Sequence, residues 1–153
     1  LKNLEKMIKS KNFEFLDGVV IGRSDLAGSL DLTKQDVNSK IIYNKVYKTF
    51  KILRKKVKKK LILKMGGSIT KLSKNFIKKL YQENLLDNIE TRNIEIRLSK
   101  SSIDKIDLAI ANIFSFEVDW LKYKLKQREN KKNKFIYKDY LRRVKEIEKR
   151  LKK

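Results

Sequence analysis

The sequence contains no cysteine, no histidine and no proline among its 153 residues. Without cysteine, the chain has no disulfide framework and no thiolate metal site. Without histidine, it has no imidazole metal ligand and no catalytic pair of the Ser-His or Cys-His kind. A metal ion bound by this chain must therefore be held by oxygen ligands, a donor set that favours Mg²⁺, Mn²⁺ or Ca²⁺.

Long apolar runs are also missing from the sequence. No stretch approaches the roughly 18 apolar residues that a membrane-spanning helix needs, and no secretory leader is recognisable. The sequence therefore predicts a cytoplasmic protein that does not bind membranes.

Acidic residues are scarce relative to basic ones, since 18 Asp and Glu face 40 Lys and Arg, for a net charge of +22. Such a balance raises the expectation of a nucleic-acid partner. The lysines are spread over every segment, however, which favours a compositional bias over a dedicated polyanion site. The basic run over residues 54–60 fits a localisation or nucleic-acid patch, but we favour a solvated helix end whose cations complement the helix dipole.

The chain is organised around residues 18–30, Gly-Val-Val-Ile-Gly-Arg-Ser-Asp-Leu-Ala-Gly-Ser-Leu. The apolar run over residues 19–21 predicts a strand buried on both faces, as in parallel sheets. The polar Arg23, Ser24 and Asp25 predict that the strand ends there and a loop begins. Asp25 would then lie at the carboxyl end of a parallel strand, where α/β folds bind ligands and metals. A loop-capping aspartate is the alternative.

Strands and helices alternate through the first two thirds of the chain. Further strands are predicted over residues 61–65 and 89–98, and a helix-like segment over residues 1–11 precedes the first strand. One helix is predicted over residues 40–56, with a possible capping box at Thr33 and Asp36 before it. The residues that we expect in the core of these helices and their connections are Phe13, Phe15, Ile42, Val46, Phe50, Leu53, Val57, Leu72, Phe76, Ile77, Leu80 and Tyr81.

Gly66 and Gly67 separate the second strand from the next helix. Two glycines before a helix can let backbone N–H groups face an anion, although an ordinary tight turn is at least as good an interpretation. From residue 101 onward the pattern is helical, with one helix to about residue 128, a turn over residues 130–134, and a second helix over residues 136–151. We expect an antiparallel helical pair, with Trp120 as a packing anchor.

The order strand, helix, strand, helix, strand predicts two right-handed crossovers and a parallel sheet of three strands. Three such strands do not close a barrel and would leave two unprotected sheet edges. We therefore expect either further strands upstream of Leu1 or a partner chain that covers an edge.

Residues 17–30 resemble the strand-six motif of the HpcH/HpaI aldolase and citrate lyase beta-subunit family, in the form Gly-Arg-Ser-Asp-Leu-x-x-Ser-Leu. Three further segments of the family's pattern follow in order: Asp36-Val37-Asn38-Ser39, Met65-Gly66-Gly67-Ser68-Ile69, and residues 76–92 from Phe-Ile-Lys-Lys-Leu to Glu-Thr-Arg. The resemblance implies the C-terminal portion of a (β/α)₈ TIM-type barrel over residues 1–98, followed by a helical extension over residues 99–153.

The resemblance also implies a metal-dependent carbon–carbon lyase. Asp25 matches the family's aspartate ligand to Mg²⁺ or Mn²⁺, and the backbone around Ser24 would receive the carboxylate of a keto acid or acyl-CoA-type substrate. Arg23, Ser24, Asp25, Gly66 and Gly67 are the residues expected at the substrate. The metal would stabilise an enolate, which requires a Lewis acid held by hard oxygen ligands.

The sequence departs from the family pattern in what it lacks. The glutamate ligand and the catalytic arginine would lie upstream of Leu1, and Glu5 stands in helix-like sequence. We therefore expect a fragment without catalytic residues of its own, which is inactive unless the missing half is supplied. The expected partner is a second copy in a homo-oligomer or a missing N-terminal half. The alternatives are a small basic RNA- or ribonucleoprotein-binding protein and a helical interaction module. Which acid or thioester would be cleaved is not encoded in these residues.

Overall fold

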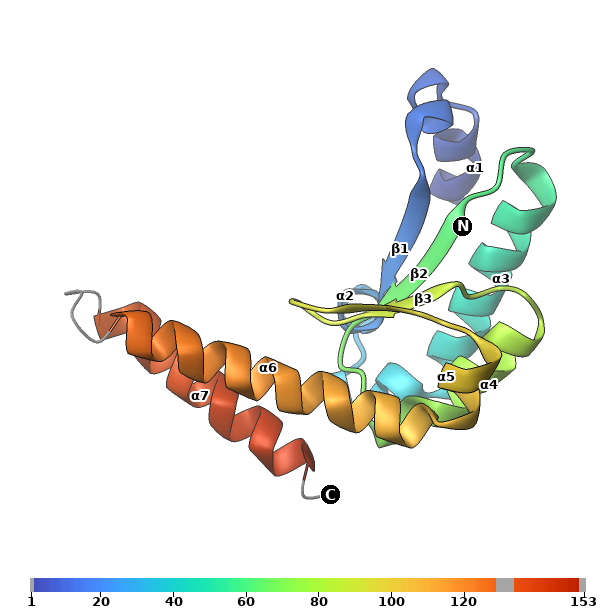
Figure 1. The fold of residues 1–153 in the computed structure, drawn as a ribbon. Helices are drawn as coiled ribbons and strands as arrows, with labels where there is room; N and C mark the ends of the chain where they lie inside the picture. Colours follow the sequence, from blue (N-terminus) through green and yellow to red (C-terminus); the bar gives the residue numbers. More distant parts are fainter. Residues whose placement is uncertain (1, 129–133, 152–153) are drawn as a thin grey trace. The chain divides into compact units, whose positions relative to one another are not determined.

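The computed structural model describes residues 2–128 and 134–151 (Figure 1). The chain divides into two compact units, Leu1–Ile103 and Asp104–Lys153. The sequence places this division between residues 98 and 99. Among the described residues, no helix combines the length and the apolar character needed to cross a membrane.

The first unit is an α/β structure with a sheet of four strands in the order β1-β2-β3-β4. The first three strands are parallel, as predicted, and the fourth is antiparallel. Their bounds are β1 (Gly18–Gly22), β2 (Ile62–Gly66), β3 (Asn88–Glu90) and β4 (Glu95–Arg97). The sheet therefore agrees with the predicted crossovers and adds a strand.

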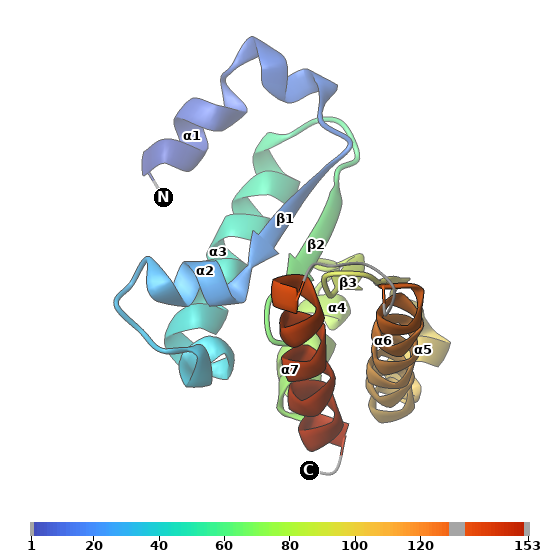
Figure 2. The ribbon, with the colours of Figure 1, turned by 90° about the vertical axis from the view of Figure 1, so that its left-hand side faces the viewer.

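Two helices connect the parallel strands and form the main core with them. In α3 (Lys40–Lys56), Ser39 caps the start by accepting a hydrogen bond from the N–H of Ile42 at 3.4 Å. The buried residues of α3 are Ile42, Val46, Phe50 and Leu53, and those of α4 (Lys74–Gln82) are Phe76, Ile77 and Leu80. Figures 1 and 2 together show that both helices lie on the same side of β1 and β2.

The two faces of the sheet differ in burial. Leu63 and Met65 of β2 are fully buried, whereas the alternate residue Ile62 is 40% exposed and Val20 of β1 is 48% exposed. Because side chains alternate across a strand, the helices cover one face and leave the other open. The prediction that β1 is buried on both faces is therefore wrong for this structure.

The predicted single strand over residues 89–98 is also wrong, because this stretch folds back on itself. The N–H of Thr91 donates to the carbonyl oxygen of Ile94 at 2.8 Å and closes a tight turn. Strand β4 then pairs antiparallel with β3, with Ile89 opposite Ile96. The alternation of apolar and charged residues in this stretch is interrupted because the turn separates the two strands.

Shorter elements fill the connections. The predicted loop after β1 is instead the short helix α2 (Arg23–Gly28). Residues Lys34–Asn38 form a 3₁₀ turn that begins with the predicted capping box. In this box the N–H of Thr33 donates to Asp36 at 2.9 Å. The chain begins with α1 (Lys2–Ile8) and a 3₁₀ turn over Lys11–Phe15. Phe13 is buried as predicted, whereas Phe15 and Leu72 are 76% and 81% exposed.

The second unit is the predicted pair of helices, α6 (Ile106–Arg128) and α7 (Lys134–Leu151), which lie side by side and antiparallel (Figures 1 and 2). A short helix, α5 (Lys100–Asp104), precedes them. An ion pair of 2.8 Å joins Lys122 of α6 to Glu148 of α7. The predicted turn over residues 130–134 falls largely outside the described residues. Trp120 is 37% exposed and stacks on Tyr123, with ring centroids 5.8 Å apart.

Candidate functional site

The carboxyl ends of β1 and β2 bring together the residues predicted to contact substrate. Gly22, the last residue of β1, lies in register with Gly66, the last residue of β2. Arg23, Ser24 and Asp25 form the first turn of α2, immediately after β1. Gly67 follows β2 directly. The residues singled out in the sequence therefore converge at one edge of the sheet, because adjacent parallel strands end on the same side.

Arg23 is the most constrained residue at this edge, since its side chain is completely buried. Its Nε donates to the carbonyl oxygen of Gly66 at 3.3 Å, and its Nη2 donates to the carbonyl of Gly67 at 2.8 Å and to Ser73 Oγ at 3.2 Å. Its Nη1 donates to Asn38 Oδ1 at 2.6 Å and to the carbonyl of Val37 at 3.4 Å. These contacts match the five N–H donors of a guanidinium group.

The acceptors around Arg23 are all uncharged, so the buried cation has no carboxylate among them. Burial lowers the pKa of Arg23 to about 10, because desolvation disfavours the charged form. The group remains protonated at neutral pH, and the ring of Phe76 lies 5.1 Å from its central carbon as a further favourable contact. The arginine therefore fastens the end of β2, the 3₁₀ turn before α3 and the start of α4 around the end of β1.

Gly67 allows the two strand ends to approach closely. It has a positive φ of 80°, and a Cβ atom there would lie 2.6 Å from the backbone nitrogen of Ser24 and 2.7 Å from that of Arg23. Only glycine fits such a backbone contact without strain. Beside it, the hydroxyl groups of Ser24 and Ser68 are 3.0 Å apart and share a hydrogen bond.

Asp25 is exposed, and its carboxylate lies over Gly22, where a Cβ atom would come within 2.7 Å of Oδ2. Glu90, at the end of β3, occupies the corresponding place beside Gly66, with its Cγ 3.1 Å from the position of a Cβ atom there. The paired glycines thus leave a strip without side chains, with a carboxylate at each side. Glu90 belongs to a segment quoted for the resemblance, but it was not predicted as a site residue, because the predicted strand over residues 89–98 concealed that β3 ends there.

Metal ligands at this edge are limited to oxygen atoms. Among residues 2–128 and 134–151, no group of three or more histidine, cysteine, aspartate or glutamate side chains is arranged to hold a metal ion. Asp25 is a hard oxygen donor of the kind that Mg²⁺ and Mn²⁺ take. The described residues therefore fit one carboxylate of a metal site at this edge and do not complete one.

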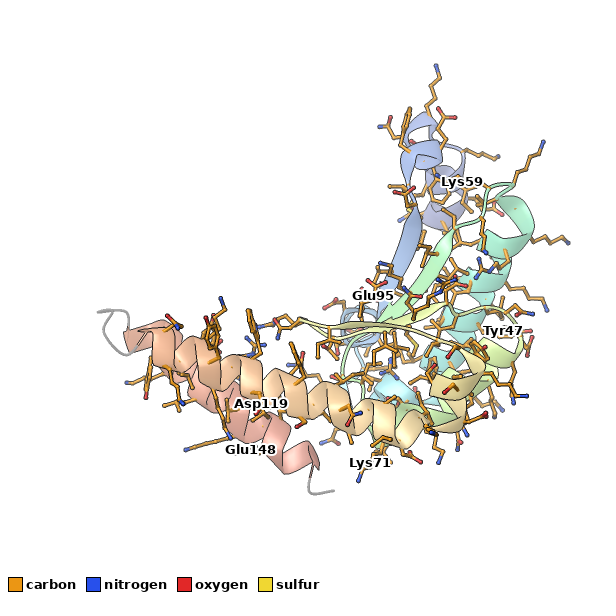
Figure 3. The ribbon with its side chains drawn as sticks, in the orientation of Figure 1. Tyr47, Lys59, Lys71, Glu95, Asp119 and Glu148 are labelled. Carbon is orange, nitrogen blue, oxygen red and sulfur yellow. The ribbon has the colours of Figure 1, made fainter. Side chains whose placement is uncertain are left out.

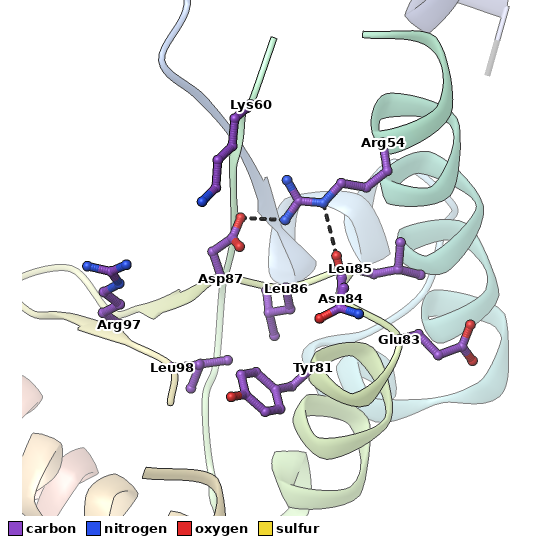
Figure 4. A pocket seen from close by; sticks show the side chains of 10 residues that line it. All are labelled: Arg54, Lys60, Tyr81, Glu83, Asn84, Leu85, Leu86, Asp87, Arg97 and Leu98. Atoms are coloured by element: carbon purple, nitrogen blue, oxygen red, sulfur yellow. Dashed lines mark hydrogen bonds and ion pairs between the residues drawn. The ribbon is translucent and has the colours of Figure 1, made fainter. Parts of the chain in front are cut away.

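The opposite edge of the sheet carries a pocket of about 450 Å³ (Figure 4). Arg54 spans it, donating to Asp87 at 2.6 Å, to the carbonyl of Leu61 at 2.6 Å and to that of Asn84 at 2.9 Å. Lys60 and Arg97 line the same pocket. Because Leu61 precedes β2 and Asp87 precedes β3, this pocket lies at the amino-terminal ends of the strands, away from Asp25.

Comparison of this chain with protein-family models, with curated proteins and with solved structures found no match in any of the three. The resemblance to the aldolase and citrate lyase family therefore stays a prediction from the quoted motifs.

Proposed function

We propose that this chain contributes part of the active site of a divalent-metal-dependent carbon–carbon lyase that acts on a keto acid or an acyl-CoA-type carboxylate. The support comes from the quoted motifs and from the way in which Arg23 is used. A buried cation without a countercharge is costly, and a well-packed apolar side chain would serve stability as well or better. Its use here therefore points to the positioning of the strand ends on which Asp25 lies.

The order of the strands supports the barrel portion of the proposal. In the order β1-β2-β3 with both crossover helices on one face, each strand is added beside the previous one. Doubly wound sheets instead reverse direction and carry helices on both faces. The open face, with Val20 and Ile62 exposed, corresponds to the interior of a barrel, where parallel strands are covered on both sides.

Each residue of the site has a role in this proposal. Asp25 provides one oxygen ligand to Mg²⁺ or Mn²⁺, and the first turn of α2 around Ser24 contacts the substrate carboxylate, next to Gly66 and Gly67. A metal ion held there would act as a Lewis acid toward a developing enolate oxygen. Arg23 is a positioning residue, because its donors are directed at protein acceptors. In this proposal the remaining ligands and the acid–base groups are supplied by the missing half that the sequence predicts upstream of Leu1.

The proposal is tested by Mn²⁺ binding to the isolated chain, followed as paramagnetic broadening of backbone amide NMR signals, with and without oxalate. Broadening should centre on residues 22–26 and 66–68 and should be lost in Asp25→Asn. Asp31→Asn is the matched control, because Asp31 is also an exposed aspartate in the loop after α2 and its loss removes the same charge. Broadening that is centred elsewhere, or that is equally reduced by both variants, would contradict the metal assignment.

A further inference from the structure

Basic side chains gather at the amino-terminal ends of the strands, at the end of the sheet opposite Asp25. Three pockets of about 420, 230 and 450 Å³ lie there. The first and second share Val57, Lys58 and Lys59, and the second and third share Arg54 and Lys60. The pockets therefore adjoin one another through these shared residues, and we call the three together the basic groove.

The basic groove is lined by eight basic side chains against three acidic ones. The basic residues are Lys9, Lys11, Arg54, Lys56, Lys58, Lys59, Lys60 and Arg97, and the acidic residues are Glu14, Glu83 and Asp87. They come from three segments that are distant in the sequence, namely residues 9–14, residues 54–60 and residues 83–97. Folding brings cations from separate segments together along one concave surface, which is the clustered arrangement expected of a polyanion-binding site.

Three of the basic side chains in the basic groove have a partner within the protein, and two of these partners are carboxylates. Arg54 pairs with Asp87 at 2.6 Å, Lys56 pairs with Glu5 at 2.5 Å, and Lys59 donates to the backbone carbonyl of Glu14. Within the described part of the chain, the remaining five basic residues make no side-chain hydrogen bond or ion pair: Lys9, Lys11, Lys58, Lys60 and Arg97. Like charges lined up in a concavity raise the local potential and attract an anionic partner.

We propose that the basic groove binds the phosphate backbone of single-stranded nucleic acid. A series of cations along a groove matches the regular spacing of phosphates in a flexible strand. Because the three pockets follow one another along residues 54–60, their cations suit a flexible strand better than a planar bilayer or a rigid duplex. Lysine presents a point charge and not a planar fork, so the contacts position the backbone without reading the base sequence.

The test measures how the binding of a labelled oligouridylate depends on NaCl concentration, by fluorescence anisotropy. The variant Lys9→Gln/Lys58→Gln/Lys60→Gln removes three unpaired cations of the basic groove. The matched control, Lys34→Gln/Lys40→Gln/Lys71→Gln, removes three exposed lysines near the carboxyl ends of the strands, namely one in the 3₁₀ turn before α3, the first residue of α3 and one in the connection before α4. Figure 3 shows Lys59 and Lys71 at opposite ends of the first unit. Both variants lose the same charge, and circular dichroism verifies that both are folded.

The variant of the basic groove should lower the slope of log Kd against log salt by about 2, since each phosphate contact on a single strand contributes about 0.7. If the variant and the original chain have equal affinities on extrapolation to 1 M salt, this difference in slope makes the variant bind about 100-fold more weakly at 0.1 M salt. The control variant should bind like the original chain. Equal slopes for the two triple variants would overturn the proposal. It would also be overturned if the three lysines were needed for binding to phosphatidylserine vesicles and the chain did not bind the oligonucleotide. Asp25→Asn should leave oligonucleotide binding unchanged, so this test is independent of the proposed lyase.

Discussion

At the scale of single residues, Arg23 has the most consequences for its surroundings. Its guanidinium group joins carbonyl and side-chain oxygens from two connections, the 3₁₀ turn before α3 and the segment that runs from the end of β2 to α4. No other side chain provides five N–H donors in one plane. The residue was predicted to be near the substrate because it belongs to the Gly-Arg-Ser-Asp motif. Its burial could not be predicted, because motif spacing does not reveal which loops close over a strand end.

We expect Arg23→Lys to reduce the free energy of unfolding by about 3 kcal/mol, because lysine cannot reach all of the acceptors and leaves buried carbonyl groups unpaired. Chemical denaturation measures the change. Arg92→Lys is the matched control, since Arg92 is exposed in the turn between β3 and β4, and it should change stability by less than about 0.5 kcal/mol. Similar stabilities for the two variants would contradict the role given to Arg23.

At the scale of elements, the helix α3 and the hairpin β3–β4 show where sequence patterns succeed and fail. The bounds of α3 are those predicted, because a cap at Ser39 and an apolar stripe of four residues act locally and agree with each other. The hairpin was missed because its strands have only three residues each, too short to establish a period of two. Cross-strand partners, which no local pattern contains, stabilise it.

One of these partnerships links β4 to β2 across the sheet. Lys64 donates to Glu95 at 2.7 Å, and the side chain of Asn88 also donates to this carboxylate. The hydrogen bond from Lys64, followed by that from Asn88, holds the pKa of Glu95 below its usual value of 4.5. The pKa of Lys64 is raised, chiefly by the same hydrogen bond.

We expect the contribution of Glu95 to stability to be lost in acid. As the pH falls below about 4.5, the unfolded chain binds a proton at this residue before the folded protein does, so stability decreases with falling pH. Carbon-detected NMR titration should give a midpoint below 4.5 for the Glu95 carboxyl group. Glu95→Gln should remove this part of the pH dependence, and a midpoint at or above 4.5 in the original chain would contradict the interaction.

At the scale of the whole molecule, the sheet has one covered face and one open face within the first unit. Leu63 and Ile62 are neighbours on β2, yet the first is fully buried beneath the helices and the second is 40% exposed. Both residues are apolar, so the sequence alone does not tell which of the two is buried. Which face the helices cover depends on the direction of the crossovers and on the register between strands.

We therefore expect Leu63→Ala to cost about 2–5 kcal/mol of the free energy of unfolding, because it opens a cavity in the core. Ile62→Ala is the matched control one residue away and should cost less than about 1 kcal/mol, since much of its side chain is already in solvent. Denaturation with urea measures both. Equal losses would indicate that both faces of the sheet are covered in solution.

The sequence by itself determined the α/β character of the first unit, the three parallel strands, the bounds of α3 and the helical pair of the second unit. It also identified the strand end at which Asp25 lies. These features follow from local periodicity, caps and glycines, which act over a few residues.

Only the tertiary structure decided that Arg23 is buried among backbone carbonyls, that Glu90 lies beside Gly66, and that lysines from distant segments form the basic groove. The physical reason is that strand register and helix packing bring together residues far apart in the chain, and burial and electrostatic potential arise from that assembly. The lysines that composition alone assigned to solvated surfaces are, at one edge of the sheet, arranged along a single concave surface.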